Sequence, residues 1–548
     1  MNEAVNPESV QWDAIIIGTG MGGGTLGYEL ARLGRRVLFV EKGRSNLSTD
    51  QKPIDGKFPE QTFDLNDITD QQLNDILAHS GRLTDSLEDD TPGSKTKKVF
   101  RPILGQGTGG SSALYGMVTE RFFPEDFKPR GNFADPGTSS IPEAWPITYD
   151  ELLPWYAQAE RLYRVRGAHD PKRPNEDLSN LISPPPMISA NQEVVDFLGE
   201  RGLHPYHLHV ACEYKPECKS CQAYLCGKNC KNESGKICVA PAVEQYHATL
   251  ITECAVTAIE ATRTRVTKVQ AEWKGKQISL EGKMVIIAAG ALMTPVLMLN
   301  SKSKDWPTGL ANDEDLVGRN FMRHFVDMYI FQIKQKDPVK GQIKEIGLND
   351  FYAPNGKKYG TIQSMGHVPP FDVMLNETRQ NRKNLGKFRK WIEPRWKPWL
   401  QDRFVPLAAI MEDLPHPDNR VLPGPGSKGG TGSYLKLHYT MQANDLKRLK
   451  EFQTEVKRAF GKYRGSWFFP IFLEASKQNS ALGHQCGTVR FGDDPKTSVL
   501  DRNNKAWGLD NLYVVDTSFL PSSAGINPSL TIAANALRVA HHLHDRLG

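Results

Sequence analysis

The sequence predicts an α/β protein in which a Rossmann-like nucleotide-binding domain is interleaved with a domain rich in β-strands. Near the N-terminus a short apolar run is followed by a glycine-rich turn and a segment with helical spacing, which is the order of a βαβ unit. Strand-like segments return at 248–262 and 266–272 and lead into the apolar run 284–289. From about 326 to 480 the pattern indicates mainly strands, so that α/β segments flank a β-rich region.

Size and charge limit the classes of function. The chain has 548 residues and a formal net charge of +5, and its lysines and arginines are scattered, which predicts no nucleic-acid partner. No secretory signal stands at the N-terminus, so a cytoplasmic protein is expected, with export beside a partner subunit left open. The longest apolar stretch, 284–299, is too short for a transmembrane segment. Because it contains Gly290 and Pro295, we expect a buried strand that runs into a turn at 290–295.

A glycine fingerprint follows the first predicted strand. Gly18, Gly20 and Gly23 come after the apolar run 13–17, and Glu41 ends the next apolar run, 18 residues past Gly23. Glycines let the backbone approach a pyrophosphate at a helix N-terminus, and an acid at this spacing accepts hydrogen bonds from ribose hydroxyls. An acid at this position favours an unphosphorylated ribose. The motif therefore predicts a dinucleotide site, although it does not separate NAD from FAD.

A second glycine cluster, 105–112, comes too late in the chain to belong to the first turn. Its small residues and two final serines suit a backbone that passes close to a planar ligand or its phosphates. Taken alone, the cluster is equally compatible with a flexible loop.

In order and spacing, these motifs resemble those of the glucose-methanol-choline (GMC) family of flavin oxidoreductases. The resemblance covers most of the chain, and its motifs are 18–23 with Glu41, 107–117, 145–147 with the helix expected at 148–165, 290–295, 317–320 and 483–537. It implies an FAD-binding domain interrupted by a substrate domain built on an antiparallel sheet. The segments implied for the FAD-binding domain are 1–135, 201–325, which carries the cysteine cluster, and 481–548. Those implied for the substrate domain are 136–200 and 326–480.

The resemblance also implies which residues contact FAD. Glu41 is implied at the ribose, the backbone of Val256 at the adenine end, and Asp516 near the pyrophosphate or ribityl chain. The family often has asparagine where Tyr115 stands, so the edge of the flavin is expected to have a different environment here. The other implied contacts belong to the two glycine-rich turns and are Gly18, Gly20, Gly23, Gly109, Gly110, Ser111 and Ser112.

Two residues near the C-terminus match the catalytic pair of the family. His484 stands in the motif Gly-His-Gln-Cys-Gly-Thr and Asn527 in Ile-Asn-Pro. Hydride loss from a carbinol carbon becomes easy only as the hydroxyl proton is removed, and a neutral imidazole is a suitable base at neutral pH. The amide of Asn527 exchanges no proton but can hold the substrate oxygen. We therefore expect His484 to act as the base and Asn527 to orient the substrate.

Six of the eight cysteines lie between 212 and 238, and several interpretations of them stay open. Disulfides would suit a secreted protein, for which there is no signal. Zinc could use Cys218 and Cys221, although the next pair, Cys226 and Cys230, has a different spacing, and unligated thiols are a further alternative. Cys221, Cys226 and Cys230, with Cys218 as a fourth candidate, could also hold an iron–sulfur cluster. Their spacing is similar to the cluster-binding run of bacterial FAD-dependent glucose dehydrogenases, which favours a cluster that relays electrons.

The expected function is oxidation of a CH–OH group of a sugar or another alcohol. FAD is the expected cofactor, and an external acceptor such as a cytochrome or a small partner subunit is expected to take the electrons. An oxidase that reduces oxygen to hydrogen peroxide is the alternative, and an NAD-linked reductase is a more remote one. Basic and aromatic residues within 380–405 could shape a substrate entrance or form a solvated face.

Overall fold

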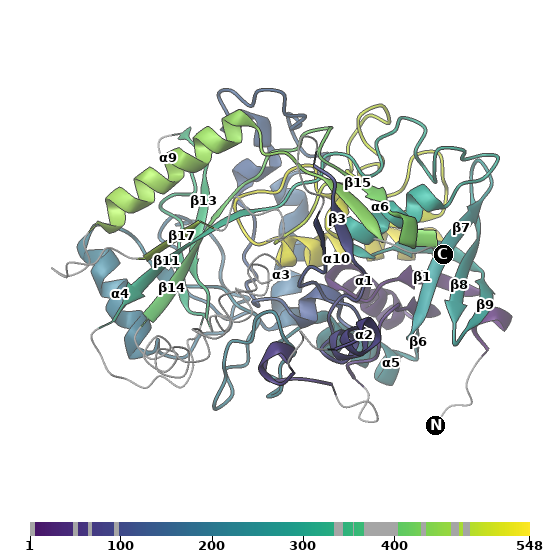
Figure 1. The fold of residues 1–548 in the computed structure, drawn as a ribbon, viewed down its shortest axis with the longest axis horizontal. Helices are drawn as coiled ribbons and strands as arrows, with labels where there is room; N and C mark the ends of the chain where they lie inside the picture. Colours follow the sequence, from purple (N-terminus) through teal and green to yellow (C-terminus); the bar gives the residue numbers. More distant parts are fainter. Residues whose placement is uncertain are drawn as a thin grey trace.

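The computed structural model describes residues 6–47, 53–63, 68–91, 98–333, 344–353, 356–366, 404–428, 434–461, 471–474 and 483–548. Nearly all of the basic and aromatic segment 380–405 lies outside these residues. The fold has two large sheets with helices packed on them, one sheet toward each end of the molecule (Figure 1). One sheet is parallel and the other is antiparallel, which confirms the predicted α/β class.

A five-stranded parallel sheet forms the Rossmann-like part. Its strands come from distant parts of the chain and are, in spatial order, β18 (Leu512–Val514), β10 (Gly282–Ile287), β1 (Trp12–Ile17), β2 (Val37–Val40) and β6 (Thr249–Ile251). Every residue of β1 and β2 is buried, as is typical of parallel strands covered on both faces. The apolar run that opens the sequence is thus the central strand.

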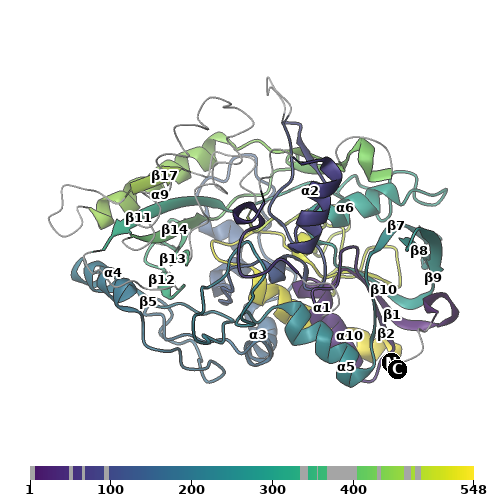
Figure 2. The ribbon, with the colours of Figure 1, turned by 60° about the horizontal axis from the view of Figure 1, so that its bottom comes forward.

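Three helices pack together on one face of this sheet. α1 (Met21–Arg32) begins soon after β1 and packs against α5 (Ala240–Tyr246) and α10 (Ser529–Leu547). Figures 1 and 2 both show these three helices grouped beside β1. α10 also packs against α3 (Tyr149–Tyr163), which agrees with the helix predicted at 148–165. A capping box between Thr148 and Glu151 starts α3.

The second large sheet is antiparallel and has six strands. In spatial order they are β17 (Ile471–Glu474), β11 (Phe325–Gln332), β14 (Phe404–Met411), β13 (Gly360–Ser364), β12 (Ile346–Leu348) and β5 (Tyr206–His207). Along β11, buried residues alternate with partly exposed ones, which places one face toward a core. α4 (Ser189–Glu200) and α9 (Ala443–Phe460) contribute to that core. On α9 the contributing residues recur at helical spacing and are Leu449, Phe452, Val456 and Phe460.

Two smaller sheets and the helix α2 also belong to the described fold. The four-stranded sheet consists of β15 (Arg420–Pro423), β16 (Leu435–His438), β3 (Leu87–Asp89) and β4 (Lys98–Phe100). The three-stranded sheet consists of β7 (Cys254–Ala261), β8 (Val266–Trp273) and β9 (Lys276–Leu280), where strands were predicted at 248–262 and 266–272. α2 (Asp70–His79) lies in the polar N-terminal region.

The segment 290–295, expected to be a turn, is the start of a helix. α6 (Gly290–Asn300) follows β10 closely and contains Pro295. Proline has no N–H, so the carbonyl four residues earlier, that of Ala291, loses its helical partner. The buried Thr488 hydroxyl donates a hydrogen bond of 2.7 Å to that carbonyl oxygen. The prediction of a turn was wrong because this contact, formed by a residue far along the chain, compensates for the proline.

Replacing Thr488 by valine should destabilise the protein by about 1–3 kcal/mol, because the Ala291 carbonyl would lose this partner while remaining buried. Urea denaturation followed by circular dichroism measures the loss. Thr454→Val is the matched control, since Thr454 is an exposed residue of α9 whose hydroxyl bonds to Lys450 of its own helix. Equal stabilities for the two variants would contradict the role given to Thr488.

Candidate active site

A cavity of about 400 Å³ lies at the carboxyl edge of the parallel sheet. Ligands of open α/β sheets bind at this edge, where the ends of parallel strands meet. Gly23 and Gly109 lie behind the cavity wall. The other predicted site residues outside the cysteine cluster line the cavity and are Gly18, Gly20, Glu41, Gly110, Ser111, Ser112, Val256, His484, Asp516 and Asn527.

The first glycine turn exposes backbone to the cavity. Gly18 has a φ of +98°, and a Cβ there would lie 2.5 Å from the Ala288 oxygen. A Cβ on Gly20 would meet nothing within 4 Å, so this residue leaves room for a ligand. A Cβ on Gly23 would lie 2.2 Å from the Gly18 oxygen, so its role is to let α1 pack closely. Gly20 is the N-cap of α1 and provides no side-chain cap, which leaves the first N–H groups of the helix for an anion.

The Glu41 carboxylate joins the two glycine-rich turns. One oxygen accepts hydrogen bonds from the backbone N–H of Thr19 (3.1 Å) and from its hydroxyl (2.6 Å). The other accepts from the N–H groups of Gly43 (2.9 Å) and Gly107 (3.1 Å). The acid expected at the ribose therefore also holds the second glycine loop against the first, and a ribose hydroxyl would share these oxygens.

Asp516 likewise joins two segments of the cavity wall. Its buried carboxylate accepts hydrogen bonds from the Gly290 N–H (3.0 Å) and the Thr294 hydroxyl (2.5 Å) at the start of α6. Its other oxygen accepts from the N–H (2.8 Å) and hydroxyl (2.5 Å) of Ser518. A Cβ on Gly290 would again meet nothing within 4 Å, so α6 begins with open backbone at the cavity.

The expected catalytic pair is brought together beside this cavity. Asn527 Nδ2 lies 3.2 Å from His484 Nε2, and Asn527 is buried. Ser529, the first residue of α10, also lines the cavity, and this helix has no side-chain cap. The positive end of the α10 dipole therefore favours negative charge next to the pair.

A third residue, His324, determines the tautomer of His484. His324 Nε2 lies 2.9 Å and 3.1 Å from two backbone oxygens, those of Ala524 and Ser523, so this nitrogen must carry a proton. Burial lowers the pKa of His324 to about 4, and the ring is therefore neutral with an unprotonated Nδ1. The His484 Nδ1, 2.8 Å away, must then donate to His324. His484 Nε2 is left as a lone-pair acceptor that faces Asn527.

The environment of His484 keeps its ring neutral. Burial is the main cause that holds the pKa of His484 well below its ordinary value, and the proximity of His324 and of Lys344 adds to it. His484 also has a φ of +56°, in the left-handed region that non-glycine residues rarely occupy. Such strain typically costs about 1–3 kcal/mol and is found where a side chain must be aimed.

Sequence reasoning missed two buried residues of this neighbourhood, His324 and Lys344. His324 lies four residues after the motif 317–320, and that proximity was the available signal. Lys344 stands just before β12 and has no local motif. Both come near His484 only through the fold.

The cysteines do not support the expected iron–sulfur site. Cys218 and Cys230 pack with Cys212, whereas Cys221 packs with Phe58 and Tyr224, and Cys226 touches both groups. The thiols thus fall into two packing groups rather than one. In the part of the chain that the structure describes, no three His, Cys, Asp or Glu side chains are arranged to hold a metal ion. All eight cysteines, including Cys254 and Cys486, are free thiols.

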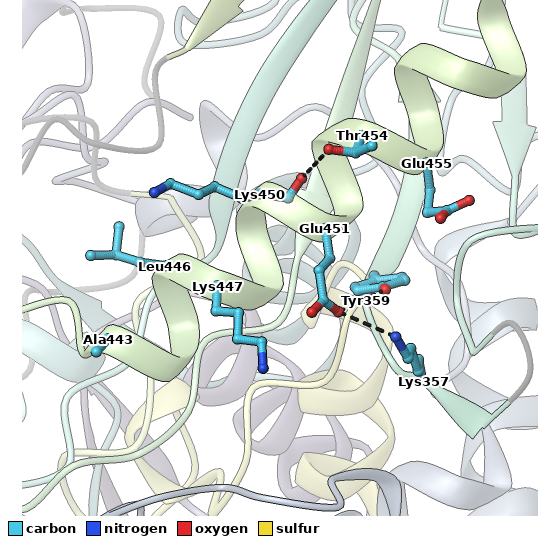
Figure 3. A pocket seen from close by; sticks show the side chains of 9 residues that line it. All are labelled: Lys357, Tyr359, Ala443, Leu446, Lys447, Lys450, Glu451, Thr454 and Glu455. Atoms are coloured by element: carbon cyan, nitrogen blue, oxygen red, sulfur yellow. Dashed lines mark hydrogen bonds and ion pairs between the residues drawn. The ribbon is translucent and has the colours of Figure 1, made fainter.

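A second hollow lies on the outer face of α9 and is a surface groove (Figure 3). Lys447, Lys450 and Glu455 extend from the helix along it, and Glu451 forms an ion pair of 3.5 Å with Lys357. It shares no lining residue with the cavity described above. Within the described ranges, no helix is long and apolar enough to cross a membrane.

Comparisons with known proteins agree with the geometry. An N-terminal family model described as GMC oxidoreductase matches residues 13–326, and a C-terminal one matches 419–536. The chain is 27% identical to paromamine 6'-oxidase of Streptomyces fradiae, over 96% of this chain and 90% of that protein. It is 23% identical to the fructose dehydrogenase large subunit of Gluconobacter japonicus, over 97% and 98%. The crystal structure of pyridoxine 4-oxidase from Mesorbium loti has the same fold, with a TM-score of 0.66, 18% identity and coverage of 98% of this chain and 99% of that one.

Proposed function

This chain belongs to the GMC oxidoreductase family, and on that premise we propose that His484 and Asn527 are the residues with which it oxidises a CH–OH group. Members of the family bind FAD and act on sugars and other alcohols. The observation that supports the proposal is the hydrogen-bonded row from His324 through His484 to Asn527 at the cavity wall.

The cavity suits FAD because backbone groups are exposed along its wall. We assign the pyrophosphate to the turn at Gly18 and Gly20, where the uncapped N-terminus of α1 presents its N–H groups. Glu41 would hold the ribose, and the irregular pairing of β7 at Val256 suits contact with the adenine end. When bound, FAD supplies the acceptor for the hydride.

Residues of the protein itself can accept the proton of the substrate hydroxyl group. An alcohol that reaches the pair donates its hydroxyl hydrogen to the His484 Nε2 lone pair, and the Asn527 amide holds the oxygen. Removal of that proton makes hydride loss from the carbon favourable. The Asn527 Oδ1 is buried and has no partner among the described residues, so it can accept a second hydroxyl hydrogen. His324 keeps Nδ1 of His484 occupied, so that the proton is accepted at the nitrogen that faces the substrate.

The pH dependence of the reaction tests this assignment. The base is the neutral form of His484, whose pKa is held below 6.5, so protonation requires more acid than usual. The value of kcat/KM should therefore stay level as the pH falls through 6.5 and decline only further below. Rapid-mixing measurements of anaerobic flavin reduction by a panel of sugars and alcohols provide the profile. An acid limb above pH 6.5 would contradict it, and failure of every alcohol to reduce the flavin would reject the function itself.

We propose that a quinone, a cytochrome or a partner subunit, rather than oxygen, takes the electrons. The relative named as a large subunit supports this proposal, and the relative named as an oxidase favours the alternative. Turnover in air, measured as peroxide, should be slow compared with turnover with a dye acceptor. Equal rates would identify an oxidase.

A further inference from the structure

Gln222 presents its side-chain amide to the active-site cavity. The residue is partly exposed and lines the cavity together with His484 and Asn527. Its amide oxygen Oε1 accepts a hydrogen bond of 3.0 Å from the Lys344 Nζ, whereas no described residue accepts a hydrogen bond from its amide nitrogen Nε2. A glutamine amide has one acceptor oxygen and two N–H donors. Because the oxygen is bonded to Lys344, the two N–H groups are left to bind a ligand in the cavity.

Lys344 lies behind this part of the wall and holds the amide in place. It is 3% exposed and is not among the residues that line the cavity. A Cβ on Gly116 would lie 2.4 Å from the Lys344 Nζ and 2.8 Å from the Gln222 Oε1, so the missing side chain at Gly116 lets the two groups meet. The backbone N–H of Lys344 also donates to the Ser220 hydroxyl at 3.1 Å. Lys344 is thus bonded to the loop that carries Gln222 through both its backbone and its side chain.

The backbone near Gln222 is held in an unusual conformation. Ser220 has a φ of +45° and Ala223 a φ of +65°, in the left-handed region that non-glycine residues rarely occupy. Ala223 is fixed by two hydrogen bonds, since its N–H donates to the Leu114 oxygen (2.7 Å) and its own oxygen accepts from Arg82 (3.3 Å). Strain of this kind persists where the surrounding structure imposes it, and it is frequent at ligand-binding sites. The loop is therefore built to aim the side chain between these two residues.

The Gln222 amide also lies near the proposed base. The proximity of Lys344 contributes to the lowered pKa of His484. Since Gln222 is bonded to Lys344 and lines the same cavity as His484, a substrate that meets the base can extend toward the Gln222 amide.

We propose that Gln222 binds an oxygen atom of the substrate other than the one that is oxidised, and that Lys344 is the positioning residue that keeps the amide N–H groups turned toward it. The inference rests on the function proposed above and adds a residue that determines specificity. A sugar or a polyol provides such an oxygen, and a monohydric alcohol does not. That oxygen would accept a hydrogen bond from Gln222 while the reacting CH–OH group is held at His484 and Asn527.

The test compares D-glucitol with 1-hexanol, which has the same carbon chain and a single hydroxyl group. The ratio of their kcat/KM values, measured with a dye acceptor, should favour D-glucitol in the wild type. Gln222→Met should lower that ratio by about 10-fold, mainly through KM for D-glucitol, because one hydrogen bond to the substrate is lost. Gln192→Met is the matched control, since Gln192 is exposed on α4 and lies outside the cavity lining.

Lys344→Met tests the positioning role. It leaves Gln222 in place but releases its amide, so it should lower the same ratio. The double variant Gln222→Met/Lys344→Met should be no worse than Gln222→Met alone, whereas additive losses would overturn the coupling between the two residues. The double variant also removes the buried amine that Gln222→Met leaves without its amide partner, so a loss of stability in the single variant does not obscure the result.

Other results would overturn the proposal. A wild-type preference for 1-hexanol, an unchanged ratio in Gln222→Met or an equal loss for both alcohols would mean that Gln222 does not select the substrate. A weaker affinity for FAD with an unchanged ratio would make Gln222 a contact of the cofactor instead. Failure of D-glucitol to reduce the flavin, with reduction by another alcohol, would reject only this subsite, whereas failure of every alcohol would reject the function proposed above.

Discussion

Replacing His484 by glutamine is expected to lower kcat/KM by about 10²–10⁴-fold, the usual contribution of a general base. Glutamine retains a polar group near Asn527 and His324 but cannot accept the substrate proton. Anaerobic flavin reduction by a good substrate measures the loss in the reaction step itself. The visible spectrum should still show bound flavin, since the residues assigned to FAD are untouched.

A matched histidine separates this effect from a general response to substitution. His204 is exposed and hydrogen-bonds to Asp350 at 2.7 Å, far from the pair in sequence and outside the cavity lining. His204→Gln should therefore reduce the flavin at the wild-type rate. If His484→Gln did the same, another group would have to be the base.

Replacing Lys358 by methionine is expected to destabilise the protein by about 3–5 kcal/mol. Lys358 is fully buried between two carboxylates, with Nζ 2.7 Å from Glu412 and in direct contact with Asp126. Without the ammonium, two buried negative groups would face each other. Tyr352 extends this network, since its hydroxyl donates to Asp126 (2.6 Å) and accepts from the Gly525 N–H (3.2 Å).

The preceding residue is an unusually close control. Lys357 is exposed and pairs with Glu451 across the outer groove at 3.5 Å, an arrangement worth little in water (Figure 3). Urea denaturation should show a change within about 0.5 kcal/mol for Lys357→Met. Similar losses for the two variants would mean that the buried network does not carry the stability assigned to it.

Local sequence patterns were sufficient to predict part of the fold and of the candidate site. The first strand, the glycine turn and Glu41 follow one another within a short segment, so their arrangement is determined by neighbouring residues. The pair His484 and Asn527 could be predicted because the motifs around them resemble those of a family. In both cases the residues that indicate the feature are close together in the sequence.

The other features depend on contacts between distant segments. The helix at Pro295 is stabilised by Thr488, and the tautomer of His484 depends on His324, which is 160 positions away. The cysteine spacing describes distances along the chain but not which thiols pack together in the fold. Lys344 has no motif, and only the fold brings it within electrostatic range of His484.

The order of strands in the parallel sheet has a consequence for biogenesis. Its central strand β1 is synthesised well before the neighbouring β10, which begins at Gly282, and long before the edge strand β18, which begins at Leu512. Pairings of such high sequence separation form slowly, and they expose apolar edges while they are incomplete. The sheet beside the glycine fingerprint can therefore close only when the chain has been made as far as β18. Nascent chains are thus expected to complete the cofactor site only after β18 has been synthesised.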